Sequence, residues 1–312
     1  MNTKKPILVT GAHRSGSTWV GRMLSEAPGV AYIHEPFSVT DRPGVGICSA
    51  RFPYWFTYIT RNTEVGYYQD MRKTIEFKYN WRAALQSCRS VADLRNVKEE
   101  YTFFLTHRRH GSRPLLKDPL ALFSAAWMAD RFNMDVVVII RHPAAFVSSI
   151  KKLNWAHPFS HFLKQSLLME TVLSPFAAEI REYATREHSI TDQAILLWRL
   201  LYYMTMNYQR QHREWIFVRH EDLSQDPLTG FTHLYERLDL EFSSHVREKV
   251  LEYSSSTNPA DTDAPVGSDA TLKRNSRENM WNWKNRLTPT EIKTIRERVE
   301  DISKAFYTNE DW

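Results

Sequence analysis

Residues 11–18 read GAHRSGST, and this stretch decides the fold that we expect for the chain. It follows a β-branched run at 7–10 and precedes an apolar helical pattern over 20–27. A glycine-bearing loop between a strand and a helix directs backbone N–H groups and a helix N-terminus at an anion. The spacing copies that of a Walker A loop, except that Ser17 replaces the lysine and Arg14 supplies the positive charge. The stretch therefore predicts an anion-binding strand–loop–helix unit.

Short β-branched runs alternate with helical patterns along the rest of the chain. This alternation predicts a three-layer, P-loop-like α/β fold with a mainly parallel central sheet flanked by helices. Strands are expected at 7–10, 115–117, 136–140 and 215–218, and helices at 20–27, at 143–153 and after the capping-box spacing of Thr288 and Glu291. We find no domain boundary, so we expect one domain over residues 1–312, with a mobile loop at about 254–276.

The composition narrows the class of protein. The 312 residues carry 41 Lys+Arg and 36 Asp+Glu, a formal net charge of +5, without the run of like charges typical of a nucleic-acid-binding arm. No apolar stretch approaches the ~20 residues of a membrane span. The two cysteines, Cys48 and Cys88, cannot build a disulfide framework, so we expect a reducing, cytoplasmic location. We expect an anionic ligand, no nucleic-acid partner and no membrane span.

A kinase or NTPase is the first enzyme class to weigh, because its phosphate loop has a similar spacing. Such enzymes hold Mg²⁺ with an acidic residue at a strand end. The expected strand at 136–140 instead ends at Arg141, and Glu221 and Asp222 lie beyond the end of 215–218. These features argue against phosphoryl transfer and favour an anion held by cations and amides, with no metal site. An NTP-dependent kinase and a non-catalytic nucleotide-binding protein are the alternatives.

Two motifs together resemble those of the sulfotransferase superfamily, whose donor is 3′-phosphoadenosine 5′-phosphosulfate (PAPS), and especially those of its carbohydrate and bacterial members. Residues 14–19, RSGSTW, resemble the loop that binds the 5′-phosphosulfate. Residues 141–143, RHP, with Ser149 on the following helix, resemble the 3′-phosphate motif. A weaker similarity to the family's C-terminal segment lies at residues 283–285, WKN.

The resemblance implies which residues bind the donor. Arg141 resembles the residue that holds the 3′-phosphate, and Ser149 resembles its partner, although Ser148 is the neighbouring alternative. Arg274 and Arg277 lie where the family has a basic loop over the nucleotide, but the family's Arg-Lys-Gly triplet is absent. The set implied for PAPS, or for its product 3′-phosphoadenosine 5′-phosphate (PAP), is Arg14, Ser15, Gly16, Ser17, Thr18, Trp19, Arg141, Ser149, Arg274 and Arg277.

Two further segments carry the implied catalytic residues. Residues 34–37, HEPF, are similar to the Glu-Pro element of carbohydrate and bacterial sulfotransferases, whose glutamate is the proposed general base. The Lys-x-His segment of cytosolic aryl and steroid sulfotransferases has its nearest counterpart in residues 117–119, KDP, which lack the histidine. The expected catalytic residues are Glu35 as base, His34 as its rival, and Lys117 and Arg14 beside the sulfuryl group. In the alternative, Glu35 is structural and pairs with Arg14 or Lys117.

The reaction implied by the resemblance is in-line transfer of a sulfuryl group from PAPS to an acceptor hydroxyl or amine. The Glu35-Pro36 element and the aromatic-rich block at 52–81 favour a hydroxyl on a carbohydrate or glycolipid. A small-molecule metabolite or a phenol is the alternative acceptor. Because aromatic side chains usually pack as core, we expect the block chiefly to cap the fold. The sequence leaves the oligomeric state open.

Overall fold

The computed structural model describes residues 4–40, 44–261 and 272–312. The contacts within it divide the chain into two compact units. The first unit comprises Met1–Thr10 and Pro28–Val136, and the second comprises Gly11–Ala27 and Val137–Trp312. A single domain over the whole chain stays a prediction. Of the mobile loop expected at 254–276, residues 262–271 lie outside the described part.

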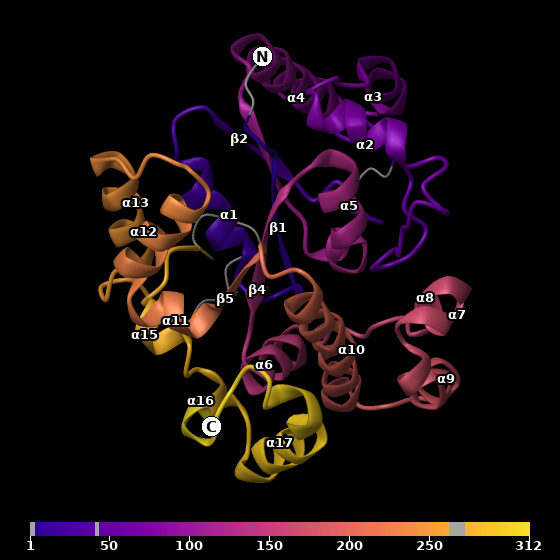
Figure 1. Cartoon of the computed structure of the whole chain (residues 1–312), viewed down its shortest axis with the longest axis vertical. Helices are drawn as coiled ribbons and strands as arrows, with labels where there is room; N and C mark the ends of the chain where they lie inside the picture. The colour runs from indigo at the N-terminus through magenta and orange to yellow at the C-terminus, as the bar shows by residue number, and fades with distance from the viewer. Residues whose placement is uncertain (1–3, 41–43, 262–271) are drawn as a thin grey trace. The chain divides into compact units, whose positions relative to one another are not determined.

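The strands confirm the expected α/β class, a parallel sheet flanked by helices. They follow the sheet order β2-β3-β1-β4-β5, and the strand pairs β1–β3, β2–β3 and β4–β5 are parallel. Figure 1 labels β1, β2, β4 and β5. The strands are β1 Ile7–Gly11, β2 Val30–His34, β3 Arg113–Lys117, β4 Asp135–Ile140 and β5 Ile216–Arg219. The sequence patterns predict all of them except β2. Its short segment, VAYIH, has no continuous run of β-branched residues.

In the first unit, three strands end at one edge of the sheet. β2 pairs with β3 from Val30 opposite Arg113 to His34 opposite Lys117, and β1 pairs with β3 through Val9 opposite Lys117. The residues that follow these strands therefore share the carboxyl edge of the sheet. The helices of this unit are α2 Tyr68–Ile75, α3 Trp81–Ser87, α4 Val91–His110, the 3₁₀ helix η1 Pro119–Ser124 and α5 Ala125–Phe132.

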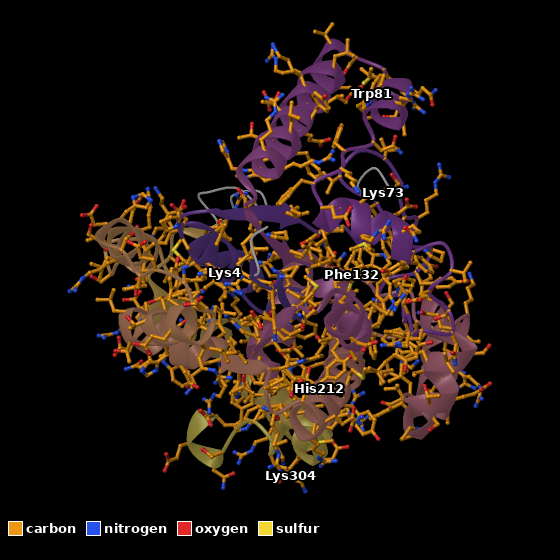
Figure 2. The ribbon with its side chains drawn as sticks, turned by 45° about the horizontal axis from the view of Figure 1, so that its top comes forward. Lys4, Lys73, Trp81, Phe132, His212 and Lys304 are labelled. Carbon is orange, nitrogen blue, oxygen red and sulfur yellow. The ribbon has the colours of Figure 1, made fainter. Side chains whose placement is uncertain are left out.

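The aromatic-rich block at 52–81 belongs to the first unit, and its rings range from fully buried to exposed. Phe52 stacks on Phe37 with 4.0 Å between the ring centroids, and Phe56 is fully buried. Trp81, at the start of α3, is 47% exposed (Figure 2). Burial of Phe52 and Phe56 agrees with the expectation that the block chiefly caps the fold, which stays a prediction, and Trp81 is an exposed ring of the block.

In the second unit, β4 and β5 pair from Val137 opposite Ile216 to Ile140 opposite Arg219. The long helix α10 packs against α6 and α17 and buries Trp198. The helices of this unit are α1 Ser17–Ser25, α6 Pro143–Leu153, α7 Ser160–Leu163, α8 Ser166–Thr171, η2 Ser174–Phe176, α9 Ala177–Thr185, α10 Ile190–Gln211, α11 His220–Gln225, α12 Pro227–Arg237, α13 Ser244–Ser254, α15 Ser276–Asn279, α16 Trp283–Arg286, α17 Pro289–Ser303 and η3 Asn309–Asp311.

Local sequence signals set the ends of the predicted helices. The side chain of Thr288 accepts the N–H of Glu291, and the carboxylate of Glu291 accepts the N–H of Thr288, so the expected capping box begins α17. α6 begins at Pro143, where proline already has a helical φ. None of the helices in the described ranges is long and apolar enough to cross a membrane.

Candidate active site

The loop after β1 keeps its conformation through two glycines. Gly16 has a φ of 96°, and a Cβ there would lie 2.3 Å from Cδ2 of His220. Gly11 has a φ of 140°, and a Cβ there would lie 2.4 Å from the carbonyl oxygen of Ile139. α1 begins at Ser17 directly after this turn, and no side chain of the described residues caps its first N–H groups. The loop therefore ends in an uncapped helix N-terminus, which favours an anion.

Arg14 connects this loop to the second motif of the sequence. Its backbone is left-handed, with a φ of 63°, a conformation that costs a non-glycine residue roughly 1–3 kcal/mol. Its Nε donates to Oγ of Ser149 on α6 at 3.0 Å. The guanidinium carbon also lies 5.9 Å from the centroid of the Trp155 ring. The contact brings together two motifs that are 135 positions apart in the chain, with Ser149 rather than Ser148 as the partner of Arg14.

Positive charge is concentrated around Arg14. Burial, and then the charges of Arg141, Arg274 and Arg286, lower the pKa of Arg14 to about 10. Burial also lowers the pKa of Arg274, where Asp261 opposes the shift and Arg286 adds to it. We call these four arginines the guanidinium cluster. Like charges gathered in a partly buried place are stabilised when an anion binds among them.

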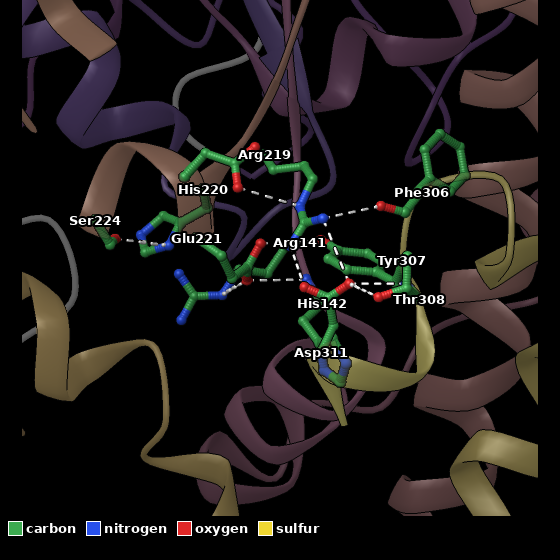
Figure 3. A network of polar contacts seen from close by, with 11 residues as sticks. Arg141, His142, Arg219, His220, Glu221, Ser224, Phe306, Tyr307, Thr308 and Asp311 are labelled. Atoms are coloured by element: carbon green, nitrogen blue, oxygen red, sulfur yellow. Dashed lines mark hydrogen bonds and ion pairs between the residues drawn. The ribbon is translucent and has the colours of Figure 1, made fainter. Parts of the chain in front are cut away.

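The backbone of Arg141 is fixed at the end of β4. Its N–H donates to Oη of Tyr202 at 2.7 Å, and its carbonyl accepts from Nε1 of Trp198 at 3.1 Å. Oε1 of Glu221 lies 3.7 Å from Nε of Arg141 (Figure 3). Burial lowers the pKa of Arg141, and Glu221 opposes that shift. A guanidinium held in this way suits a charge-assisted contact to a phosphate.

Buried donors in the two motifs also point to a ligand. The hydroxyls of Ser15 and Ser148 and the indole N–H of Trp19 are buried, and each lacks a hydrogen-bond partner within the described ranges. A buried polar group left in this state costs about 1–3 kcal/mol. An anion with several oxygen acceptors would satisfy such donors. Together with the N-terminus of α1 and the guanidinium cluster, these residues fit the phosphosulfate and 3′-phosphate of PAPS.

The basic residues near the C-terminus divide into two groups. Arg274 belongs to the guanidinium cluster, and the contact with the 3′-phosphate that the resemblance implied for it stays a prediction. Arg277 on α15 is exposed, and its Nε donates to the carbonyl of Gln225 at 3.0 Å, so its side chain is directed to the backbone of α11. Arg286 is a member of the cluster that sequence reasoning missed, although it directly follows the family-like residues 283–285.

Glu35 and Lys117 form an ion pair at the carboxyl edge of the first unit. Nζ of Lys117 contacts Oε1 of Glu35, and the N–H of Glu35 donates to the carbonyl of Lys117 at 2.9 Å. The side chain of Lys117 is 1% exposed and that of Glu35 is 29% exposed. Glu35 also has a left-handed φ of 41°. A buried ammonium group therefore holds a carboxylate that solvent can reach, which is one of the two pairings considered from the sequence.

His34, the rival base, lies at the end of β2. Its Nδ1 is 3.2 Å from Oη of Tyr32, and its Nε2 is 3.9 Å from Oε1 of Glu35. Its side chain is half exposed. The two candidate bases are therefore neighbours, and both are accessible.

Asp118 is a further charged residue at this edge, and sequence reasoning did not assign it a role. Its carboxylate accepts the N–H of Phe37 at 2.6 Å and that of Leu120 at 2.9 Å. Its carbonyl accepts from Oγ1 of Thr10 at 2.8 Å. Burial, and then the charge of Glu35, raise the pKa of Asp118 to about 7. Asp118 thus connects Thr10 of β1 with the segments that follow β2 and β3.

The chain belongs to the sulfotransferase family, because the model of that family matches residues 6–244. The resemblance implied by the two motifs is thereby confirmed, and the chain is a PAPS-dependent sulfotransferase. No curated protein matches it.

Three solved structures are similar to the chain at low sequence identity. The sulfotransferase domain of the Synechococcus PCC 7002 olefin synthase is 17% identical, with 99% of this chain and 98% of that chain covered and a TM-score of 0.49. The sulfotransferase domain from the curacin biosynthetic pathway is 14% identical, with 96% and 99% covered and a TM-score of 0.48. Mouse sulfotransferase SULT7A1, complexed with PAP, is 9% identical, with 98% and 86% covered and a TM-score of 0.48.

Proposed function

We propose that the chain transfers a sulfuryl group from PAPS to an acceptor hydroxyl, with Arg14 and Arg141 as donor-binding residues and Glu35 as general base. One observation above all supports the binding of PAPS. The guanidinium cluster occurs together with buried hydrogen-bond donors in Ser15, Trp19 and Ser148 that lack partners in the described chain. A ligand with several anionic oxygens is what such a combination favours.

The residues of the loop would bind the 5′ end of the donor. Arg14, Ser15 and the first N–H groups of α1 would hold the phosphosulfate, and Arg141 would hold the 3′-phosphate. When bound, PAPS supplies the sulfuryl group and a phosphate that leaves with the bonding electron pair. Arg14 and the N-terminus of α1 would stabilise the negative charge that grows there. One preorganised donor of this kind contributes about 2.7–4 kcal/mol to lowering a barrier.

Glu35 would take the proton that the acceptor hydroxyl loses while its oxygen bonds to sulfur. The similarity of residues 34–37 to the Glu-Pro element supports this role. Lys117 would hold the carboxylate in position, and the exposure of Glu35 leaves the carboxylate open to an acceptor.

The acceptor is proposed to be a carbohydrate or glycolipid hydroxyl, on the strength of the Glu35-Pro36 element. A small metabolite or a phenol is the alternative acceptor. Phe52 and Phe56 are buried, so these two rings are not accessible for stacking against a sugar. The exposed Trp81 and the half-buried aromatic side chains of the block are the remaining candidates for contact with a sugar ring.

A transfer assay tests this proposal. The chain is incubated with sulfur-labelled PAPS and a panel of glycans, glycolipids and phenols, and Arg141→Ala is assayed in parallel. We expect label on a hydroxyl-bearing acceptor, in a reaction that needs Arg141 and no ATP. Transfer of phosphate from Mg·ATP, with none of sulfate from PAPS, would contradict the proposal and support a kinase.

A further inference from the structure

Glu221 connects Arg141 to the C-terminal part of the second unit (Figure 3). Its Oε1 lies 3.7 Å from Nε of Arg141 and accepts the N–H of His142 at 3.1 Å, at the start of α6. Its Oε2 accepts from Oη of Tyr307 at 2.9 Å. Both oxygens of the carboxylate thus have fixed partners, and the side chain is 11% exposed. Glu221 is therefore a rigid, negatively charged support beside Arg141.

The position of Glu221 determines which nitrogens of Arg141 are available. A guanidinium group has its donors in a planar fork, with Nε on one side and the two terminal nitrogens on the other. Nε of Arg141 faces Glu221 as an ion pair, without a hydrogen bond, and we find no hydrogen bond from its terminal nitrogens to the described residues. A carboxylate fixed near Nε thus favours one orientation of the fork. In that orientation the terminal nitrogens can bind a second anion in bidentate fashion.

Tyr307 belongs to a short C-terminal segment, residues 306–311, that Arg219 holds at the end of β5. Nη1 of Arg219 donates to the carbonyl of Phe306 at 3.3 Å, and Nη2 contacts Oδ1 of Asp311. The guanidinium carbon also lies 4.6 Å from the centroid of the Tyr307 ring. Burial raises the pKa of Tyr307 well above its usual value, so the phenol keeps its proton and remains a donor.

We propose that the C-terminal segment 306–311 is a functional part of the 3′-phosphate site, with Tyr307 as a positioning residue. Tyr307 holds Glu221, Glu221 orients the guanidinium of Arg141, and Arg141 presents its terminal nitrogens to the phosphate. This inference rests on the proposed function, because it requires Arg141 to bind the 3′-phosphate of the donor.

A pair of matched tyrosine variants tests the inference in the full-length chain. Tyr307→Phe removes the hydroxyl that donates to Glu221. Tyr183→Phe is the control, since Oη of Tyr183 accepts from Nη2 of Arg298 at 2.8 Å and also bonds to a charged side chain in the same unit. The dissociation constants of PAP and of ADP, which lacks the 3′-phosphate, are measured by calorimetry, with ADP determined by its displacement by PAP.

We expect Tyr307→Phe to weaken the binding of PAP about tenfold, the size of effect that follows the loss of one hydrogen bond to a charged group. The affinity for ADP should change by less than about twofold, and Tyr183→Phe should change neither affinity. Asp311→Asn weakens the contact of the segment with Arg219. It should weaken the binding of PAP by a smaller factor than Tyr307→Phe does, and it should likewise leave the affinity for ADP nearly unchanged. In the background of Arg141→Ala, Tyr307→Phe should have almost no effect on PAP.

Three results would overturn the inference. These are an unchanged PAP affinity in Tyr307→Phe, an equal loss for PAP and ADP, and an undiminished effect of Tyr307→Phe in the Arg141→Ala background. A wild-type chain that does not prefer PAP to ADP is a different result, because it contradicts the proposed function itself. The two failures are therefore distinguishable in one set of titrations.

Discussion

The guanidinium cluster of the second unit and the carboxyl edge of the first unit balance their charges in different ways. In the cluster, burial and three neighbouring positive charges lower the pKa of Arg14 to about 10. At the carboxyl edge, Lys117 and Glu35 neutralise each other, and Asp118 is the residue whose pKa moves, to about 7. In the cluster, Glu221 pairs with Arg141 and Asp261 pairs with Arg286, so four arginines face two carboxylates and positive charge is in excess. At the carboxyl edge, Lys117 and Glu35 balance each other.

Because of this difference, the geometry itself supports an anion site at the guanidinium cluster, whereas a catalytic role at the carboxyl edge rests on the family resemblance. Gathered positive charge and unpartnered buried donors favour an anion whichever family the chain belongs to. An ion pair such as Lys117–Glu35 is equally compatible with a structural and a catalytic role. The catalytic assignment of Glu35 therefore depends on its Glu-Pro element and its exposure, and it is the part of the account most open to experiment.

The largest expected effect is on turnover, and it tests the role of the carboxyl edge. Glu35→Gln keeps the size of the side chain but cannot accept the proton, so we expect kcat to fall by roughly 10²–10⁴. PAP affinity should stay the same, because the donor residues are untouched. Steady-state kinetics and calorimetry check both, with Glu99→Gln on the exposed face of α4 as the control.

Nearly full activity in Glu35→Gln would show that the ion pair is structural. His34→Gln then tests the neighbouring imidazole as the base. A combined loss of activity and of folding would be visible as a lowered Tm, and it would identify the ion pair as a contribution to stability.

The second prediction concerns the other region of this comparison, the guanidinium cluster. Arg14→Gln removes one of the mutually repelling charges and should weaken PAP binding about tenfold to a hundredfold, the loss expected for a charge-assisted contact. The Tm of the ligand-free chain should not fall, because the repulsion inside the cluster decreases. Calorimetry and thermal unfolding measure the two effects. A lower Tm with unchanged PAP affinity would indicate that Arg14 serves the fold.

The smallest expected effect is the pH dependence that Asp118 adds to stability. Burial raises its pKa in the folded chain to about 7, from the ordinary value of 3.8 expected in the unfolded chain. Between these values the folded state binds more protons than the unfolded state, so the free energy of unfolding decreases as pH rises, by at most ~1.4 kcal/mol per pH unit.

Urea unfolding of the wild type and of Asp118→Asn between pH 4 and pH 8 measures this contribution. The stability of the wild type relative to the variant should decrease from about pH 4 to about pH 7 and then level off. A constant difference over the whole range would contradict the raised pKa of Asp118.

Local sequence signals predict much of the fold and part of the site. The β-branched runs, the glycine loop, Pro143 and the capping box at Thr288 each act within a few residues, so the sequence alone reveals them. The same holds for Arg14 and Arg141, which stand next to strands that can be recognised. Contacts to Ser149 and to Arg274 support the grouping of residues that the motifs implied.

The residues that sequence reasoning missed act through contacts between distant segments. Glu221 reaches Arg141 and Tyr307 from α11, and Asp118 connects β1 with the segments that follow β2 and β3. Arg286 joins Arg14 from α16. Nothing in the spacing of these residues along the chain indicates such contacts, because tertiary folding brings them together. The exposed backbone contact of Arg277 is unpredictable for the same reason.

The most direct test of the central claim is a calorimetric titration with PAP, ADP and Mg·ATP. The claim is that the guanidinium cluster, with Arg141 as its 3′-phosphate contact, is the donor site of a sulfotransferase. We predict that the wild type binds PAP much more tightly than ADP or Mg·ATP, and that Arg141→Ala loses this preference. Equal affinity for the three ligands, or a preference for Mg·ATP that Arg141→Ala leaves unchanged, would contradict the claim.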